Sequence, residues 1–215
     1  MGNQHKLAGV SVLVWAVLAL VGFALNIVLA ALGRLDIYDS ETALQFLEQR
    51  PVLVTGSHFF YGLAGIAFVL TAVAFYEWLP REGGGYLARV SITFGIIAGT
   101  LFFISGQIGG WGGVDVRYVQ AIRSADYVRE AYLSLAIVVN RMFAAAITVS
   151  GLWFLVTNLS IVKNKILPAV ISYLGLGAGV LALSGLLLPG GGLGLLGFLL
   201  GTIWGILVGL LLLRR

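Results

Sequence analysis

The stretch SLAIVVNRMFAAAITVSGLWF, Ser134–Phe154, decides the fold class of this chain. It is long enough to cross about 30 Å of hydrocarbon as a single helix, and its composition is almost entirely apolar. Arg141 lies inside it beside Asn140, with no acidic residue in the stretch. A guanidinium stays charged in proteins, so it must find a partner or reach water. The stretch therefore predicts a membrane helix and raises the question of what Arg141 binds.

The composition of the whole chain is that of an integral membrane protein. Of its 215 residues 60% are hydrophobic and 10% are charged, whereas soluble domains carry about 25% charged residues. The chain has no cysteine, which excludes disulfides, thiolate metal sites and a cysteine nucleophile. The net charge is +4 without any basic run. We therefore expect membrane lipid, and no nucleic acid, as its partner.

Six apolar runs are long enough to span a membrane; they cover residues 7–32, 52–79, 87–108, 132–156, 166–188 and 193–213. The two longest connections each hold a short amphipathic stretch. One precedes Pro51, and the other follows the four glycines around Trp111. We predict one domain over residues 1–215, an all-α integral membrane bundle of six transmembrane helices with two short interfacial helices in the outer loops.

The charges of the connections predict the orientation. With the N-terminus inside, the inner side holds seven basic and two acidic side chains, and the outer side holds five basic and seven acidic ones. The positive-inside rule then places both termini in the cytoplasm and the chain in the cell membrane. The tryptophans lie mostly toward the ends of the predicted helices, which is typical of interfacial aromatic residues; they are Trp15, Trp78, Trp111, Trp153 and Trp204.

Glycines recur every four residues in the last two predicted helices. This spacing puts them on one helix face, where a neighbouring backbone can approach closely. Two uses are open for this face: packing inside the bundle, or an outward surface for another membrane protein or a second copy of the chain. The glycines concerned are Gly197, Gly201, Gly205, Gly209, Gly175 and Gly179.

Polar side chains from four helices are expected at one level below the outer loops. We take these residues as candidates for binding the head group of an amphiphile: Arg141, Asn140, His58, Gln107 and Asn26. Alternatively, Arg141 forms an ion pair with an outer-loop acid such as Glu130 or Asp126, or reaches lipid phosphates.

Known catalytic motifs are not found in the sequence. There is no G-x-S-x-G, H-E-x-x-H or G-x-x-x-x-G-K-[ST] pattern. The two histidines, His5 and His58, are expected on opposite sides of the membrane, so they cannot form a bis-histidine haem site or a multi-histidine zinc site. We therefore expect no enzyme, no metal and no cofactor.

The C-terminal half carries a resemblance to a known family. An arginine-bearing fourth helix is followed by LPAVISYLGLGAGVLALSGLLLP, with Leu167-Pro168 and Gly175, and by a last helix that contains tryptophan. From Leu7 to Arg215 the chain resembles uncharacterised bacterial six-helix integral membrane proteins that are classed as a domain of unknown function. The resemblance implies a six-helix membrane fold and no activity, with Arg141 as the most distinctive polar residue.

Two functions remain open from the sequence. The glycine faces and the missing catalytic groups favour a non-catalytic accessory or structural subunit that packs against a larger membrane complex. The alternative is a small carrier or receptor for a lipid, a quinone or another anionic amphiphile, bound in the polar layer of the outer leaflet. An outward glycine face would favour the subunit, and a cavity beside Arg141 would favour the carrier.

Overall fold

The computed structural model describes residues 2–32, 49–79, 85–120, 123–185 and 192–214. Its helices are α1 (Gly2–Ala31), α3 (Pro51–Trp78), α4 (Gly85–Gln120), α5 (Ala125–Lys163), α6 (Ala169–Ser184) and α7 (Gly192–Leu213). Apolar chains form helices in lipid because a helix satisfies its backbone polar groups internally. Five of these helices are long and apolar enough to span a membrane, whereas α6 has 16 residues and is shorter. The predicted all-α membrane bundle is confirmed.

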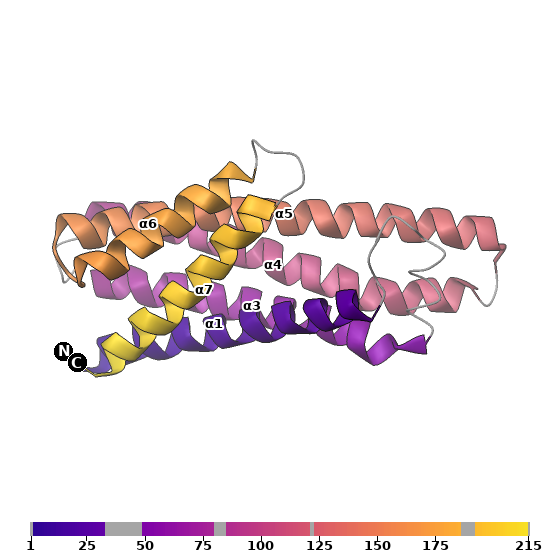
Figure 1. The fold of residues 1–215 in the computed structure, drawn as a ribbon, viewed down its shortest axis with the longest axis horizontal. Coiled ribbons are helices and arrows are strands. Elements are labelled where there is room, and N and C mark those ends of the chain that lie inside the picture. Colours follow the sequence, from indigo (N-terminus) through magenta and orange to yellow (C-terminus); the bar gives the residue numbers. More distant parts are fainter. Residues whose placement is uncertain (1, 33–48, 80–84, 121–122, 186–191, 215) are drawn as a thin grey trace.

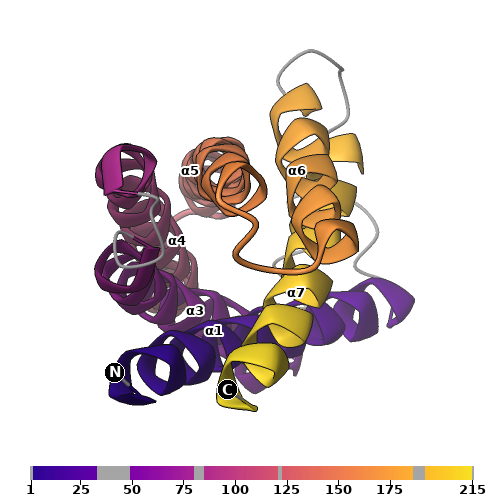
Figure 2. The ribbon, with the colours of Figure 1, turned by 90° about the vertical axis from the view of Figure 1, so that its left-hand side faces the viewer.

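The helices form a closed ring in chain order. α3 packs against α1 and α4, α5 against α4 and α6, and α7 returns to pack against α1 (Figure 2). The two ends of the chain lie side by side at one end of the molecule (Figure 1). α6 and α7 lie along the half of the bundle that holds these ends, and α7 crosses α1 obliquely. The opposite half is therefore built mainly from α1, α3, α4 and α5.

α4 and α5 are longer than the membrane requires. They contain 36 and 39 residues, or about 54 and 58 Å at 1.5 Å per residue. The interfacial helix that we predicted after Trp111 is wrong, because this segment continues α4 to Gln120. The glycines do not break the helix; a Cβ at Gly109 would meet the ring of His58, and one at Gly112 would meet Leu135. The other predicted interfacial helix falls within residues 33–48, outside the described residues.

The turn between α5 and α6 closes the end of α5 with two backbone hydrogen bonds. The N–H of Ile166 donates to the carbonyl of Ile161 at 3.1 Å, and the N–H of Lys165 donates to that of Val162 at 3.2 Å. This pair of bonds is that of a Schellman motif, in which the residue after the C-cap has a positive φ. Lys165 holds that position, with a φ of 52°. Pro168 then stands at the N-cap of α6, so the short basic connection is ordered.

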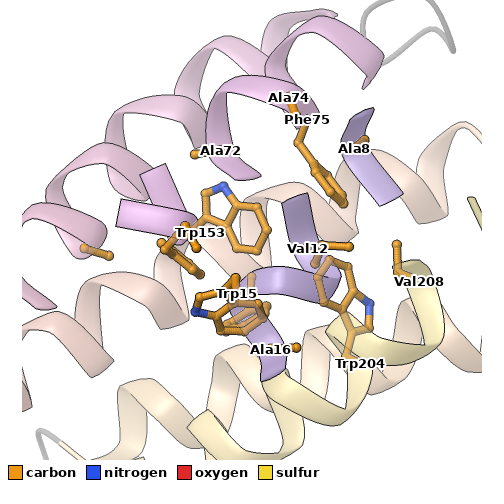
Figure 3. Packing of buried hydrophobic residues seen from close by; sticks show 14 of the residues in the cluster. Ala8, Val12, Trp15, Ala16, Ala72, Ala74, Phe75, Trp153, Trp204 and Val208 are labelled. Atoms are coloured by element: carbon orange, nitrogen blue, oxygen red, sulfur yellow. The ribbon is translucent and has the colours of Figure 1, made fainter. Parts of the chain in front are cut away.

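Aromatic side chains fill the centre of the ring. Trp153 lies 4.9 Å from Phe68, 5.6 Å from Phe75 and 5.9 Å from Trp204 between ring centroids, in edge-to-face arrangements. Figure 3 shows Trp15, Trp153 and Trp204 converging from three helices. Four of the five tryptophans are at most 1% exposed, and only Trp111, at 66%, has an exposed ring. These four tryptophans belong to the core of the bundle, so their rings pack inside it and do not face lipid.

The glycine faces of α6 and α7 are buried against helices of the same chain. A Cβ at Gly197 would meet the backbone of Ala182, one at Gly201 would meet the ring of Phe154, and one at Gly205 would meet Trp15. The remaining three glycines are placed similarly: Gly209 contacts Leu13 and Gly9, Gly175 contacts Asn158, and Gly179 contacts Leu155 and Gly151. The structure thus uses all six glycines for internal packing, and it does not place an outward partner surface on them.

Candidate functional site

Five helices converge on a cavity in the half of the bundle that lies away from the termini. Its volume is about 230 Å³. α1 contributes Phe23 and Asn26, α3 contributes His58 and Tyr61, and α4 contributes Ser105; the lining is completed by Val139, Asn140 and Phe143 of α5 and Leu195 of α7. The cavity thus brings together three of the predicted candidates, Asn26, His58 and Asn140.

The wall formed by α1 and α3 is fixed by small residues and ring contacts. Gly22 of α1 leaves room for the ring of Tyr61, which a Cβ at Gly22 would approach to 3.3 Å. Tyr61 also packs edge-to-face against Phe143, with 4.8 Å between the ring centroids. The Asn26 amide donates to the carbonyl of Gly22 at 2.9 Å, and the side chains of Asn26 and Tyr61 both line the cavity. These contacts hold one amide and one phenol at the cavity.

The opposite wall joins α4 to α5. The hydroxyl of Ser105, which is buried, donates to the carbonyl of Val139 at 3.1 Å. This bond engages the only hydrogen of the Ser105 hydroxyl, so Ser105 offers a further ligand its oxygen as an acceptor. Asn140 follows Val139 and is half-buried at the cavity. Its amide can both donate and accept hydrogen bonds, which makes it the most versatile polar group of the lining.

Gln107 lies outside this cavity. It lines a separate groove of about 640 Å³ between α3 and α4, together with Phe59, Gly106 and Trp111. The indole N–H of Trp111 donates to Oε1 of Gln107 at 3.1 Å. The predicted grouping of Gln107 with His58 and Asn140 is therefore not found.

Arg141 also lies outside the cavity, on the exposed surface of α5. Successive residues of a helix are turned by about 100°, so Arg141 leaves the helix on a different side from Asn140. Within the described residues no acidic side chain pairs with it. The pairing with Glu130 or Asp126 is wrong, because both acids belong to the same continuous helix. They precede Arg141 by about 16 and 22 Å along its axis, which is beyond the reach of the side chains.

The cavity lies about one bilayer thickness from charged residues at the other end of the bundle. About 30 Å of helix separates Lys6 from Asn26, and about 28 Å separates Glu77 from His58, at 1.5 Å per residue. The same measure gives about 33 Å between Lys163 and Arg141. Because the hydrocarbon core of a bilayer is about 30 Å thick, the cavity and Arg141 fall near the head-group region if the three charged residues mark the other boundary. An exposed arginine at this level reaches water or lipid phosphates without an internal partner.

Two polar lining residues, Tyr61 and Ser105, were not among the predicted site residues. Tyr61 stands three positions after His58, which places both side chains on one face of α3. That spacing is a signal that sequence reasoning could have used, but Tyr61 was counted with the apolar residues. Ser105 lies at the level predicted for the polar layer, near Gln107, and its bond to Val139 marks it as part of the lining.

The described lining of the cavity offers hydrogen-bonding groups to a ligand. None of its described lining residues is a carboxylate, a lysine or an arginine. Within the described ranges no three His, Asp or Glu side chains gather as ligands for a metal ion. The arrangement can hold a small polar group by amide, phenol, imidazole and hydroxyl contacts.

The comparisons with known proteins agree with this fold. No curated protein and no solved structure matches the chain. Residues 7–215 match the family described as Domain of unknown function (DUF4386). The match covers nearly the whole chain, including every helix that lines the cavity. The resemblance noted in the sequence is thereby confirmed: the chain belongs to the DUF4386 family, with five long apolar helices typical of a multi-pass membrane protein.

Proposed function

We propose that this protein is a non-catalytic membrane receptor or carrier that holds the head of a small amphiphile in the cavity. The observation that carries the proposal is the cavity itself, about 230 Å³ in volume, whose lining combines five polar side chains with four apolar ones. Buried polar groups need hydrogen-bond partners. A ligand with a polar end supplies such partners to Asn140 and Tyr61, whose contacts within the chain leave hydrogen-bonding capacity unused.

The position of the cavity favours an amphiphile over a water-soluble ligand. It lies near the boundary of the apolar slab, where lipid head groups and chains meet. Its apolar lining residues Phe23, Phe143 and Leu195 are only half-buried. A molecule whose head enters the cavity can therefore leave its hydrocarbon part against these side chains and the surrounding lipid.

A second candidate is the accessory subunit of a larger membrane complex. The glycine faces no longer support it, since they are buried within the chain. The observation that favours it is that α4 and α5 are longer than the bilayer is thick. Their extra turns carry two exposed aromatic side chains, Tyr118 on α4 and Tyr127 on α5. A projecting helical pair with exposed tyrosines is a suitable docking surface for a protein partner.

A purification from native membranes distinguishes the two candidates. We expect the intact protein to carry an amphiphile at about one copy per chain. Native mass spectrometry should detect it after the loosely bound lipid around the protein has been washed away with detergent. Asn140→Trp should abolish this species, because an indole at position 140 fills the cavity. Arg141→Trp is the matched control, since that residue leaves the helix on its exposed surface, and it should retain the ligand. A stoichiometric protein partner without any bound amphiphile would instead favour the subunit.

We further propose that both termini lie in the cytoplasm. The support is the distribution of basic residues and the position of the two ends at the same end of the bundle. The native chain has no cysteine, so single cysteines can be labelled cleanly. A cysteine at Ser124, before α5, should react with an impermeant maleimide added outside intact cells, and one at Asn164, after α5, should not. The reverse pattern would invert the orientation.

A further inference from the structure

The described lining of the cavity contains no lysine, arginine, aspartate or glutamate. Arg141 is next to Asn140 in the chain but lies on the exposed surface of α5. An anionic head group in this cavity would lose its hydration without gaining a lysine or arginine of the described lining as a counter-charge, which is unfavourable.

The hydrogen-bonding groups are suited to a neutral oxygen. Asn26 already uses one N–H for the carbonyl of Gly22, and Ser105 uses its hydrogen for the carbonyl of Val139. No hydrogen bond to another described residue occupies the amide of Asn140, which can donate to an oxygen and accept from a hydroxyl. A carbonyl or hydroxyl group matches this set of amide, phenol and hydroxyl partners.

The size of the cavity limits what enters it. Pockets that enclose a drug-sized ligand usually measure about 300–1,000 Å³, and this cavity measures about 230 Å³. It therefore fits a head group of a few atoms, with the chain of the amphiphile outside among Phe23, Phe143 and lipid.

We infer that the cavity selects amphiphiles with an uncharged carbonyl or hydroxyl head, such as a monoacylglycerol, over those with a carboxylate or phosphate head. This inference rests on the proposed function and narrows it: of the ligands that the sequence left open, it keeps carbonyl heads such as that of a quinone and excludes anionic heads. It also gives neighbouring residues different roles: Asn140 recognises the head, and Arg141 takes no part in recognition.

The test compares ligands that differ only in the head. The full-length protein in nanodiscs of zwitterionic lipid, at pH 8, is labelled with a photoreactive monoacylglycerol, and unlabelled mono-oleoylglycerol, oleate and oleoyl lysophosphatidic acid compete for the site. We expect the neutral competitor to be at least about ten-fold more effective than either anion. Asn140→Leu should weaken labelling by about ten-fold, the loss expected for one hydrogen bond to a buried group. Tyr61→Phe should weaken it in the same direction, and Arg141→Leu should leave it unchanged.

The possible failures are distinct. Equal or stronger competition by lysophosphatidic acid or oleate would overturn the selectivity and leave the proposed binding function standing. The same holds if labelling is lost in Arg141→Leu and kept in Asn140→Leu, because recognition would then be made by the guanidinium. If the photoreactive probe labels the wild type no more than the Asn140→Trp variant, the proposed function itself fails and this inference falls with it.

Discussion

Gly197→Leu is expected to prevent stable folding of the bundle. A Cβ at this position would overlap the backbone nitrogen of Ala182 in α6, and a backbone segment held between two helices cannot move aside as a flexible side chain can. Overpacking of a well-filled core typically destabilises by about 1–3 kcal/mol. A clash with backbone belongs to the exceptional group of substitutions that destabilise by more than about 4 kcal/mol.

The measurement is the midpoint of unfolding in mixed micelles titrated with a denaturing detergent. Gly177→Leu is the matched control, because it lies on α6 among the same glycines, yet the nearest atom to its Cβ would be Cδ2 of Leu200 at 3.8 Å. We expect it to unfold close to the wild type. Gly201→Leu should resemble Gly197→Leu, since its Cβ would fall on the buried ring of Phe154. Wild-type stability of both would contradict the internal packing of α7.

Trp153→Ala is expected to lower the free energy of unfolding by about 3–5 kcal/mol, the usual effect of removing a buried large aromatic side chain. Trp153 is fully buried and contacts rings of three helices, through Phe68, Phe154 and Trp204. Because lipid competes with apolar side chains, association of membrane helices depends on close van der Waals packing. The cavity left by an indole removes such packing at the centre of the ring.

Trp153→Phe separates the ring from its N–H group. Nε1 of Trp153 has no hydrogen-bond partner among the described residues, so the phenyl ring should restore most of the lost stability. Trp111→Ala, at an exposed position, should change stability by less than about 1 kcal/mol. The same unfolding titration measures all three variants. If Trp111→Ala is the more damaging change, the tryptophans stabilise the protein at the interface and the aromatic core is wrongly assigned.

The transmembrane helices could be predicted from the sequence because lipid requires long apolar runs with internally bonded backbones. The boundaries facing the long loops could not. Glycines near Trp111 usually indicate a loop in a soluble protein, yet here they sit under neighbouring side chains and α4 continues through them. The start of α5 was also misplaced: the sequence predicted it at residue 132, and the structure has it at Ala125. Asp126 and Glu130, which we had assigned to the outer loop, therefore belong to the helix.

The depth of each residue along its helix could also be predicted. Whether its side chain points into the bundle or outward could not. Counting 1.5 Å per residue placed Asn26, His58, Asn140 and Arg141 at a common level, and the structure brings the first three together. One step along α5 decides that Asn140 lines the cavity and Arg141 does not. That angle depends on how α5 packs against α4 and α6, and no local pattern of residues encodes it. The tryptophans show the same difficulty, since their positions near helix ends did not reveal that four of them point inward.

The central claim is that the cavity between α1, α3, α4, α5 and α7 is a ligand site. A density map of the protein purified from native membranes into nanodiscs tests it most directly. We predict continuous density for a head group within hydrogen-bonding distance of the Asn140 amide and the Tyr61 hydroxyl, with a chain that leaves past Phe23 and Phe143 into the lipid. A cavity that contains only water or is closed by side chains, with ordered lipid bound at Arg141 on the outside of α5, would contradict the claim.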